Sequence, residues 1–294
     1  KERIILYGDS DLDGISSVVI LEEAIKSLGG RVDSAFFPDR ENDGYGINLA
    51  ALDMLKDMAP ALFITLDLGI GNLKEVDTAN EMGFEVIIID HHEPLTGVPK
   101  ASIIVDPKQE ADDYPFKGLA NVGVTFNLCM ELLGEGISQN LKNSFLELAA
   151  LGTIADMVPQ TDQNQEIIEE GLRSLKNTFR PALRAFLDIL GDGKVFSAQG
   201  GPAMGWENSL SKIISALNSA ESVNFENESY ALLTSSDNRK CKELVEELLS
   251  RNQFKQQQVK NIIQEIERRI SQKPDEQIIF EGDPSWKLTL AGPV

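Results

Sequence analysis

Three aspartates, Asp9, Asp11 and Asp13, stand at alternate positions before Gly14 in the stretch ILYGDSDLDGISS. Carboxylates this close together repel one another unless cations neutralise them, so the spacing indicates a metal site. The same spacing opens an EF-hand calcium loop, but the twelfth position of such a loop falls on Ile20, whose side chain cannot bind calcium. The alternative is a solvated acidic turn in which aspartate caps a helix. This stretch therefore predicts either a metal site of another kind or a helix cap.

Further acidic and imidazole groups follow in three short motifs. Asp67 lies in TLDLG, and Asp90, His91 and His92 lie in IDHHEP, which holds both histidines of the chain. A histidine is more often a structural or surface residue than a ligand, but an adjacent pair after a buried strand that ends in aspartate favours metal ligation. Asp156 lies in GTIADMVP after a mostly apolar helix, and by itself it is typical of a turn before proline.

The elements that must position these groups alternate between strand and helix. Short β-branched and aromatic runs such as RIILY, LFIT and EVIIID are typical of buried parallel strands. The first helix is expected over 15–28, with Gly29 and Gly30 at its end. At least four such units, and a fifth short strand in SIIVDP, predict an α/β fold with a parallel sheet flanked by helices. Ligands bind at the carboxyl ends of such strands, so the motifs are expected to converge on one rim of the sheet.

Beyond the predicted sheet the pattern becomes helical. We expect helices within 118–155 and 165–190, a glycine-rich loop over 191–209, and one long amphipathic helix over 241–270. The last stretch, 277–294, is strand-like and stops abruptly. We therefore divide the chain into a domain that carries the motifs (1–165), a helical extension of its core (166–240), a connector helix (241–272) and the start of a truncated second domain (273–294).

The composition limits where such a protein works. The chain has 294 residues, of which 42% are hydrophobic and 25% charged, as is ordinary for a soluble globular protein. No apolar run is long enough to cross a bilayer and no signal peptide is visible, and a chain that starts at Lys1 rather than methionine is expected to be a trimmed piece. Cys129 and Cys241 form no CxxC pair, which favours a reducing cytoplasm over a disulfide framework or a zinc site.

The net charge and the kinds of ligand narrow the chemistry further. A formal net charge of −20 argues against adhesion to nucleic acid over the whole surface, but it leaves open a local basic channel or a phosphate contact through metal ions. Oxygen ligands with one imidazole favour Mg²⁺ or Mn²⁺ over zinc. Two such ions about 3.5–4 Å apart, sharing a carboxylate, would activate water for the hydrolysis of a phosphate ester.

The sequence resembles the DHH phosphoesterases, whose four motifs are similar to DSDLDG, TLDLGI, DHHEP and GTIADMVP in the same order. More narrowly, PDRENDGYGIN, YPFKGLANVGVTFNL and RPALRAFL are similar to stretches of RecJ-type single-strand-specific DNA exonucleases. The resemblance runs from Ile4 to about Leu190, and more loosely to the end of the chain. It implies that 1–165 is a DHH catalytic domain and that 273–294 begins a DHHA1-like domain.

The resemblance also implies a ligand set for two divalent ions, Mn²⁺ or Mg²⁺, with Asp67 bridging them. One ion would be held by Asp9, Asp11 and Asp67, and the other by Asp13, Asp67, His91 and Asp156. The catalytic pair would be His92, as a donor to the scissile phosphate or the leaving group, and Asp90, which would orient the histidines.

Substrate contacts are implied at four further positions. Arg40 and Asn121 would each reach a phosphate of the strand, although each residue can equally be an ordinary loop residue. Gly44 and Gly46 would let the backbone approach closely. The chain departs from the family where Tyr7 stands in place of a histidine that many relatives have, and where a Gly-Gly-His motif of the second domain has no counterpart in this sequence.

The expected function is a metal-dependent exonuclease that acts on single-stranded DNA in the 5′-to-3′ direction in repair and recombination, with a helicase or single-strand-binding protein as a partner suited to the acidic surface. Basic residues that would line a DNA channel, or form a solvated helix face, are Arg173, Lys176, Arg180 and Arg184. One alternative is a small-substrate phosphodiesterase acting on short oligonucleotides or cyclic dinucleotides. Another is an inactive replication scaffold, against which the complete ligand set argues.

Overall fold

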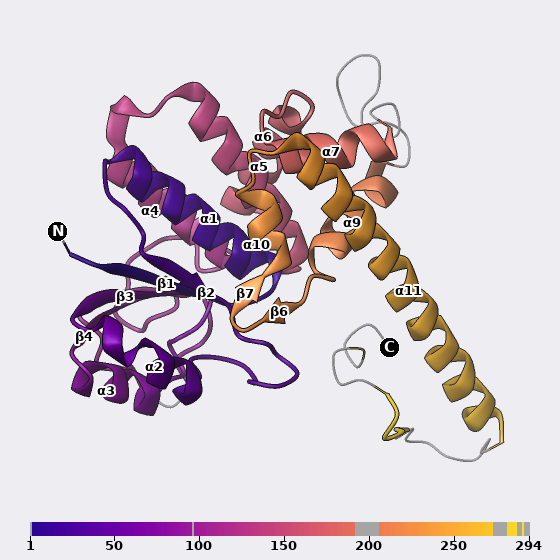
Figure 1. Cartoon of the computed structure of the whole chain (residues 1–294), viewed down its shortest axis with the longest axis horizontal. Helices are drawn as coiled ribbons and strands as arrows, with labels where there is room; N and C mark the ends of the chain where they lie inside the picture. The colour runs from indigo at the N-terminus through magenta and orange to yellow at the C-terminus, as the bar shows by residue number, and fades with distance from the viewer. Residues whose placement is uncertain (1, 96, 192–205, 273–280, 287–289, 291–294) are drawn as a thin grey trace.

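The computed structural model describes residues 2–95, 97–191, 206–272, 281–286 and 290 (Figure 1). Five strands form one sheet in the order β2-β1-β3-β4-β5, and every neighbouring pair is parallel. The strands are β1 (Ile4–Gly8), β2 (Ser34–Phe36), β3 (Ala61–Leu66), β4 (Phe84–Ile89) and β5 (Ile103–Val105). The predicted α/β fold with a parallel sheet is confirmed.

The register of the sheet aligns the strand ends that precede the acidic motifs. Gly8 pairs with Leu66, Leu66 with Ile89, and Ile89 with Val105, so β1, β3, β4 and β5 end at one level. The chain runs from β1 outward to β2 and then returns to β3 on the other side of β1. Between β1 and β3 the strand order therefore reverses, and such a switch point is where open α/β sheets bind ligands.

Helices cover both faces of the sheet, as Figure 1 shows. The helices α1 (Leu12–Ser27), α4 (Asn121–Leu133) and α5 (Gln139–Ala155) lie on one face, and α2 (Leu49–Leu55), the 3-10 turn Lys56–Met58 and α3 (Leu73–Glu81) lie on the other. Successive residues of β1 alternate between the two cores: Leu6 packs with α1, and Ile5 and Tyr7 pack with α2 and α3. The first helix ends where the glycines predict, since Gly29 takes a φ of +79°.

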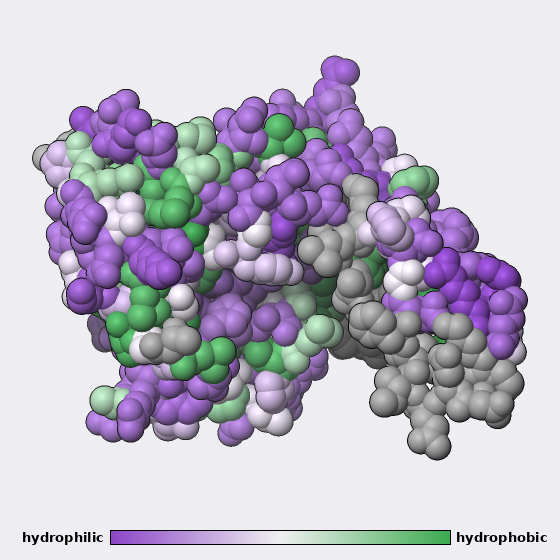
Figure 2. All heavy atoms as spheres, turned by 90° about the horizontal axis from the view of Figure 1, so that it is seen from below, coloured by the Kyte–Doolittle hydropathy of each residue, from purple (hydrophilic) through white to green (hydrophobic). Residues whose placement is uncertain are grey.

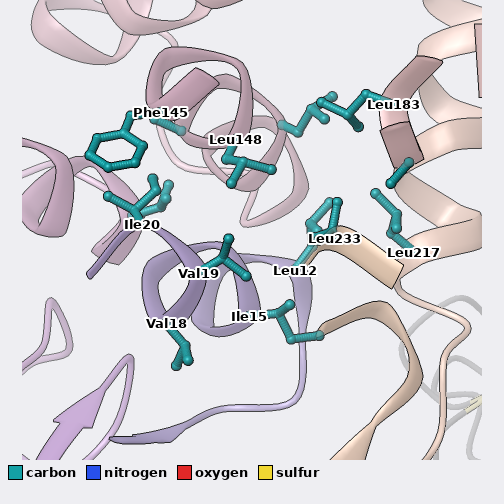
Figure 3. Close-up of a cluster of buried hydrophobic side chains, with 14 of the residues drawn as sticks. Leu12, Ile15, Val18, Val19, Ile20, Phe145, Leu148, Leu183, Leu217 and Leu233 are labelled. Atoms are coloured by element: carbon teal, nitrogen blue, oxygen red, sulfur yellow. The ribbon is translucent and has the colours of Figure 1, made fainter. Parts of the chain in front are cut away.

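The helical region after α5 shares the core above α1. It comprises α6 (Asp162–Leu175), α7 (Pro181–Leu190), α9 (Trp206–Leu217), α10 (Glu228–Leu233) and a small antiparallel hairpin of β6 (Ser222–Val223) and β7 (Glu226–Asn227). A 3-10 turn at Gly134–Gly136 joins α4 to α5. In Figure 3, Leu183 of α7, Leu217 of α9 and Leu233 of α10 gather with Leu12 and Ile15 of α1. One continuous apolar core thus supports the first helix from its outer side.

The glycine-rich loop expected over 191–209 is partly wrong. Residues 192–205 lie outside the described part of the chain, but 206–209 already belong to α9. Leu210, Ile213, Ile214 and Leu217 follow at helical spacing and are buried, and the helix that they anchor begins four residues earlier, within WENS.

The long helix α11 (Asn238–Ser271) matches the amphipathic segment expected over 241–270. Cys241, Val245 and Leu248 in its first half are buried against α7, α9 and α10, and its second half projects away from the body (Figure 1). The strand expected within 277–294 falls mostly outside the described residues. No helix in the described part of the chain is long and apolar enough to span a membrane, and the face shown in Figure 2 is mostly hydrophilic.

Candidate metal centre

The parallel hydrogen-bond ladder continues one residue past three strands and fixes where the acidic side chains leave the sheet. The N–H of Asp9 donates to Leu66 O (3.1 Å), and that of Asp67 donates to Ile89 O (3.0 Å). Asp90 likewise donates to Val105 O (3.0 Å). The three aspartates are therefore neighbours on the rim at the carboxyl ends of the strands, as the sequence predicts.

The turn after β1 brings Asp11 and Asp13 to the same rim. Asp11 is the N-cap of α1, because its Oδ1 accepts from the Gly14 N–H (3.1 Å). A Cβ at Gly14 would lie 2.4 Å from the carbonyl oxygen of Asp9, so only glycine allows the helix to start this close to the strand end. The helix-cap interpretation is thus correct for Asp11, and it accounts for one of the two carboxylate oxygens of that residue.

Asp13 is almost fully buried and joins α1 to α4. Its two oxygens accept from the backbone N–H groups of Asn121 (2.8 Å) and Val122 (2.6 Å), which point from the start of α4. Asn121 itself is fully buried, and its amide bonds to the hydroxyl of Ser17 (3.0 Å). The expectation that Asn121 contacts a phosphate is therefore wrong for this structure: the residue lies beneath the rim and holds Asp13 in place.

His91 points its second ring nitrogen at three carboxylates. Its Nδ1 donates to Leu119 O (3.0 Å), which leaves Nε2 as the unprotonated nitrogen. Nε2 lies 3.2 Å from Asp67 Oδ1, 3.7 Å from Asp156 Oδ2 and 3.9 Å from Asp13 Oδ2. Burial, followed by the charge of His92, lowers the pKa of His91 to about 4, so the imidazole is neutral at physiological pH and its lone pair is available to a metal.

Three of these atoms are buried and have no hydrogen-bond partner: Asp67 Oδ1, His91 Nε2 and Asp156 Oδ2. Burial raises the pKa of Asp13 and of Asp67 well above the usual range, and neighbouring carboxylates raise both further. Burial and the charge of Asp11 raise the pKa of Asp156 to about 6. Unpartnered acceptors around a neutral imidazole fit a divalent cation, which would relieve the repulsion that these shifts report.

The carboxylates and histidines form overlapping groups whose ligand atoms lie within 4.8 Å of one another. In the described residues these groups are Asp9 with Asp11 and Asp67, Asp13 with His91 and Asp156, and Asp67 with His91 and His92. Asp67 has a φ of +64°, a left-handed backbone that a non-glycine residue seldom adopts, and that turn aims its side chain between the other groups. These groups contain every residue of the ligand set that the resemblance implies, together with His92, and the role of each residue stays a prediction.

Arg40 binds the two aspartates at the near end of the rim. Its Nε donates to Asp9 Oδ1 (2.9 Å), and its Nη2 donates to both Asp9 Oδ2 (2.6 Å) and Asp11 Oδ2 (2.8 Å). Burial raises the pKa of Asp9 despite this partner. Burial also acts to raise the pKa of Asp11, but the Arg40 guanidinium and the Gly14 N–H together lower it below its usual range. The guanidinium also lies 5.0 Å from the centre of the Tyr45 ring. In this structure the guanidinium is bonded to Asp9 and Asp11, and its contact with a phosphate stays a prediction.

His92 is the most exposed of the rim groups, with 55% of its side chain accessible. Asp90 Oδ1 accepts from His92 Nδ1 (2.7 Å) and from the backbone N–H of His91 (2.8 Å), and Asp90 Oδ2 accepts from Ile70 N (2.9 Å). The hydrogen bond that His92 donates to Asp90 raises the pKa of His92. Asp90 thus bonds to both histidines, and Nε2 is the ring nitrogen of His92 that does not take part in this bond.

Two glycines and one tyrosine of the predicted site have local structural roles. Gly44 and Gly46 both have positive φ, and a Cβ at Gly46 would come 2.5 Å from Asn72 Oδ1. The group that approaches the backbone of Gly46 closely is therefore the Asn72 side chain of the protein itself. Tyr7, which stands where relatives have histidine, is fully buried in the core beneath β1, and its hydroxyl accepts from Asn48 N (3.4 Å).

The sequence analysis did not identify the aspartate at the end of the fifth strand. Asp106 follows β5 directly, is 1% exposed, and has one carboxylate oxygen without a hydrogen-bond partner. Its other oxygen accepts from the Lys108 N–H (2.8 Å), and the positive charge of Lys108 acts on His91, Asp156 and Asp106. Strand-then-aspartate, the signal that identified Asp90, is equally present in SIIVDP and could have found this position.

The four basic residues considered for a DNA channel are not alike. Arg180 is buried and pairs with Glu23 (2.9 Å), Ser144 (2.8 Å) and Leu233 O (2.7 Å), so it is a structural residue and does not line a channel. Arg184 is exposed and pairs with Asp188 (3.2 Å). Arg173 is exposed on α6, and Lys176 is half-buried at its end.

Comparisons with known proteins agree with this geometry. Residues 3–153 match the DHH family, N-terminal domain. Over 293 residues the chain is 35% identical to the single-stranded-DNA-specific exonuclease RecJ of Bacillus subtilis (strain 168), which covers 99% of this chain and 36% of that protein.

Solved structures are similar over most of the chain. A crystal structure of exonuclease RecJ bound to manganese has a TM-score of 0.82 at 28% identity, over 99% of this chain and 71% of that one. RecJ of Thermus thermophilus in complex with Mn²⁺ has a TM-score of 0.73 at 27% identity, over 90% of this chain and 37% of that one. This chain spans about a third of the length of the curated Bacillus subtilis relative.

Proposed function

This chain belongs to the DHH family, and from that premise we propose that it is the catalytic part of a metal-dependent exonuclease that hydrolyses single-stranded DNA from the 5′ end, in DNA repair and recombination. The observation that carries the proposal is the set of unpartnered buried atoms Asp67 Oδ1, His91 Nε2 and Asp156 Oδ2 beside the Asp9, Asp11 and Asp13 carboxylates. The names of the relatives support the substrate and the activity.

The residues divide into ligands and proton-transfer groups. Two Mn²⁺ or Mg²⁺ ions would be held by Asp9, Asp11 and Asp67, and by Asp13, Asp67, His91 and Asp156. When bound, such ions activate a water and stabilise the leaving oxygen of a phosphodiester. The manganese in the similar RecJ structures supports this choice of metal.

His92 would act next to the ligands. Asp90 fixes its Nδ1 as the bonded nitrogen, so Nε2 is the atom left to donate a proton or a hydrogen bond to the phosphate or to the leaving oxygen. The hydrogen bond that His92 donates to Asp90 raises the pKa of His92, which favours the protonated form that such a donor needs.

Contacts to the nucleic-acid strand would come from the loop that carries Arg40, Gly44 and Gly46, and from Lys108 on the opposite side of the rim. These cations are needed because the rim is otherwise acidic and would repel a phosphodiester. Arg40 would bind a phosphate only after leaving Asp9 and Asp11.

The wider setting is also a proposal. We place the protein in the cytoplasm, where its two buried free thiols, Cys129 and Cys241, would remain reduced. The division into 1–165, 166–240, 241–272 and 273–294 is supported by the long helix, which separates the sheet domain from the chain's end. The acidic surface would suit a helicase or a single-strand-binding protein as partner.

The test is hydrolysis of four substrates, each with Mn²⁺, with Mg²⁺ and with EDTA: an end-labelled single-stranded oligonucleotide, its duplex, a dinucleotide and pyrophosphate. We expect mononucleotides from the single strand only, no product in EDTA, and release of a 5′ label before a 3′ label. Cleavage restricted to the dinucleotide would indicate a small-substrate phosphodiesterase. Metal binding without cleavage of any substrate would indicate a scaffold, and either result would contradict the exonuclease.

A further inference from the structure

Arg40 occupies the position of a cation between two expected metal ligands. A single nitrogen, Nη2, lies 2.6 Å from Asp9 Oδ2 and 2.8 Å from Asp11 Oδ2, while Nε binds the other oxygen of Asp9. Asp9 and Asp11 also form, with Asp67, one of the groups close enough to share an ion. A guanidinium and a divalent ion cannot both occupy the space between these oxygens, because a bond from Mg²⁺ to oxygen is only about 2.0–2.1 Å long.

The other half of the centre differs. In the described residues, no arginine or lysine is bonded to the side chains of Asp13, His91 or Asp156. His91 Nε2 and Asp156 Oδ2 are instead buried without a hydrogen-bond partner. An ion entering there would displace no positive group, whereas an ion entering at Asp9 and Asp11 must first break three charge-assisted hydrogen bonds.

Hydrogen bonds fix the backbone of the loop that carries Arg40. The N–H of Asp39 donates to Asp43 Oδ2 (2.9 Å), and Asn48 Nδ2 donates to Asp43 O (3.1 Å), so side-chain bonds close the turn on both sides of Arg40. The Tyr45 ring beneath the guanidinium is largely exposed, so it offers a surface along which the guanidinium can leave the carboxylates.

We propose that Arg40 is an internal substitute for the second divalent ion, and that metal binding at Asp9 and Asp11 expels its guanidinium and makes it available to a phosphate. The two ions then bind in order, the Asp13, His91 and Asp156 side first. The last step rests on the proposed function: a phosphate that captures Arg40 removes it from the carboxylates. Metal and nucleic acid must therefore strengthen each other's binding by the same factor.

The first experiment needs no nucleic acid. Metal-free protein is titrated with Mn²⁺ in a calorimeter at about pH 8, where competition by protons is small. We expect two classes of site in the wild type. In Arg40→Gln the Mn²⁺ affinity of the weaker class should rise by at least about tenfold, because charge-assisted hydrogen bonds from Arg40 no longer compete with the ion. The Mn²⁺ affinity of the tighter class should change by less than about twofold.

Two further variants separate contact from charge. Lys108→Gln removes a positive charge near the rim that touches neither Asp9 nor Asp11, and it should change the weaker class by less than about threefold. Arg40→Lys keeps the charge but loses the bidentate fork, and it should lie between wild type and Arg40→Gln. Circular dichroism and thermal unfolding confirm that each variant is folded. If the weaker class of site keeps or loses affinity in folded Arg40→Gln, the proposed displacement of Arg40 by metal is wrong. If Arg40→Gln does not fold, the same result in folded Arg40→Lys decides.

The second experiment tests the coupling. The titration is repeated with a short single-stranded oligonucleotide whose linkages are phosphorothioates that resist hydrolysis. The oligonucleotide should tighten the weaker class in the wild type and not in Arg40→Gln. If the oligonucleotide does not bind at all, the proposed substrate is wrong, while the displacement by metal is still decided by the first experiment. If it binds but tightens the weaker class equally in both proteins, the coupling through Arg40 is refuted.

Discussion

Two regions of the described structure bury charged side chains in different ways. Between α5, α6 and α7, Glu147 accepts from the hydroxyls of Ser174 and Thr178 (2.6 Å each), and burial raises its pKa. Arg180 forms a bidentate pair with Glu23 in the same region. Partners from the protein surround these charges on nearly every side, and only Arg180 Nε lacks one.

At the rim of the sheet the charges are collected without such partners. Asp13, Asp67 and Asp156 surround one neutral imidazole, that of His91, and several of their atoms have no hydrogen bond. Buried polar groups are normally satisfied, so an unsatisfied cluster marks a place where something outside the chain completes the set. We therefore expect the stability of the fold to depend on the network of Glu147 and Arg180. Catalysis should depend on the charges at the rim of the sheet.

The largest effect is expected from Asp67→Ala, which removes the group shared by both halves of the rim. Hydrolysis of single-stranded DNA should fall by at least about a thousandfold, because both ions lose a ligand. In EDTA the melting temperature should stay the same or rise, since a repelling buried carboxylate is gone. Asp53→Ala, at an exposed position, is the control and should change neither quantity. Melting that falls sharply together with activity would mean that the rim is structural after all.

His92→Ala sharpens the division inside the rim. We expect kcat to fall by about 10²–10⁴-fold, as for loss of a general acid, with Mn²⁺ affinity nearly unchanged. Asp90→Asn should cost less, about 10–100-fold, because it removes only the orienting partner of His92. Steady-state kinetics and calorimetry measure the two quantities separately. A hundredfold loss of Mn²⁺ affinity in His92→Ala would make His92 a metal ligand instead.

Arg180→Met probes the other region. It leaves Glu23 without its buried partner, so the free energy of unfolding should fall by about 3–5 kcal/mol. Arg184→Met on the same helix, where the pair with Asp188 is exposed, should cost less than about 1 kcal/mol. Chemical denaturation in saturating Mn²⁺ measures both. Without denaturant, the folded Arg180→Met protein should bind Mn²⁺ with the affinity of the wild type. A loss of Mn²⁺ binding in the folded variant would show that the two regions are not independent.

The smallest effect is in the pH dependence of metal binding. Asp156 has its pKa raised to about 6, so below that pH an ion must displace its proton, and Mn²⁺ affinity should fall by up to about tenfold per pH unit. His91, with a pKa of about 4, stays neutral over this range, whereas Asp13 and Asp67, whose pKa values burial raises well above the usual range, also lose protons to an ion and contribute to the slope. Calorimetry between about pH 5 and 7 should show the decline in the wild type and a flatter profile in Asp156→Asn. Equal slopes in both proteins would assign the proton to another carboxylate.

The location of the rim was predictable because it follows from local patterns. Each buried strand ends in an acidic residue, and parallel strands end on one side of a sheet, so Asp9, Asp67 and Asp90 had to meet. The same rule applies to Asp106 and was not extended to it. The helix cap and the metal site looked like alternatives for Asp11, but its two oxygens serve different partners.

Contacts between distant segments were not predictable in this way. Arg40 reaches Asp9 across 31 positions, Asn121 reaches Ser17 across 104, and Arg180 reaches Glu23 across 157. Each of these residues looks like a surface polar group in the sequence, since nothing in its neighbourhood specifies which segment will cover it. Tertiary packing decides whether such a residue faces a substrate or is used up inside the protein.

The most direct measurement is a crystal of this chain soaked in Mn²⁺, with anomalous difference maps to locate the ions. The account predicts two peaks about 3.5–4 Å apart, with Asp67 between them and His91 Nε2 on one. Arg40 should then no longer contact Asp9 or Asp11. A single ion that Asp67 does not touch, or peaks away from the carboxyl ends of β1, β3 and β4, would contradict the account.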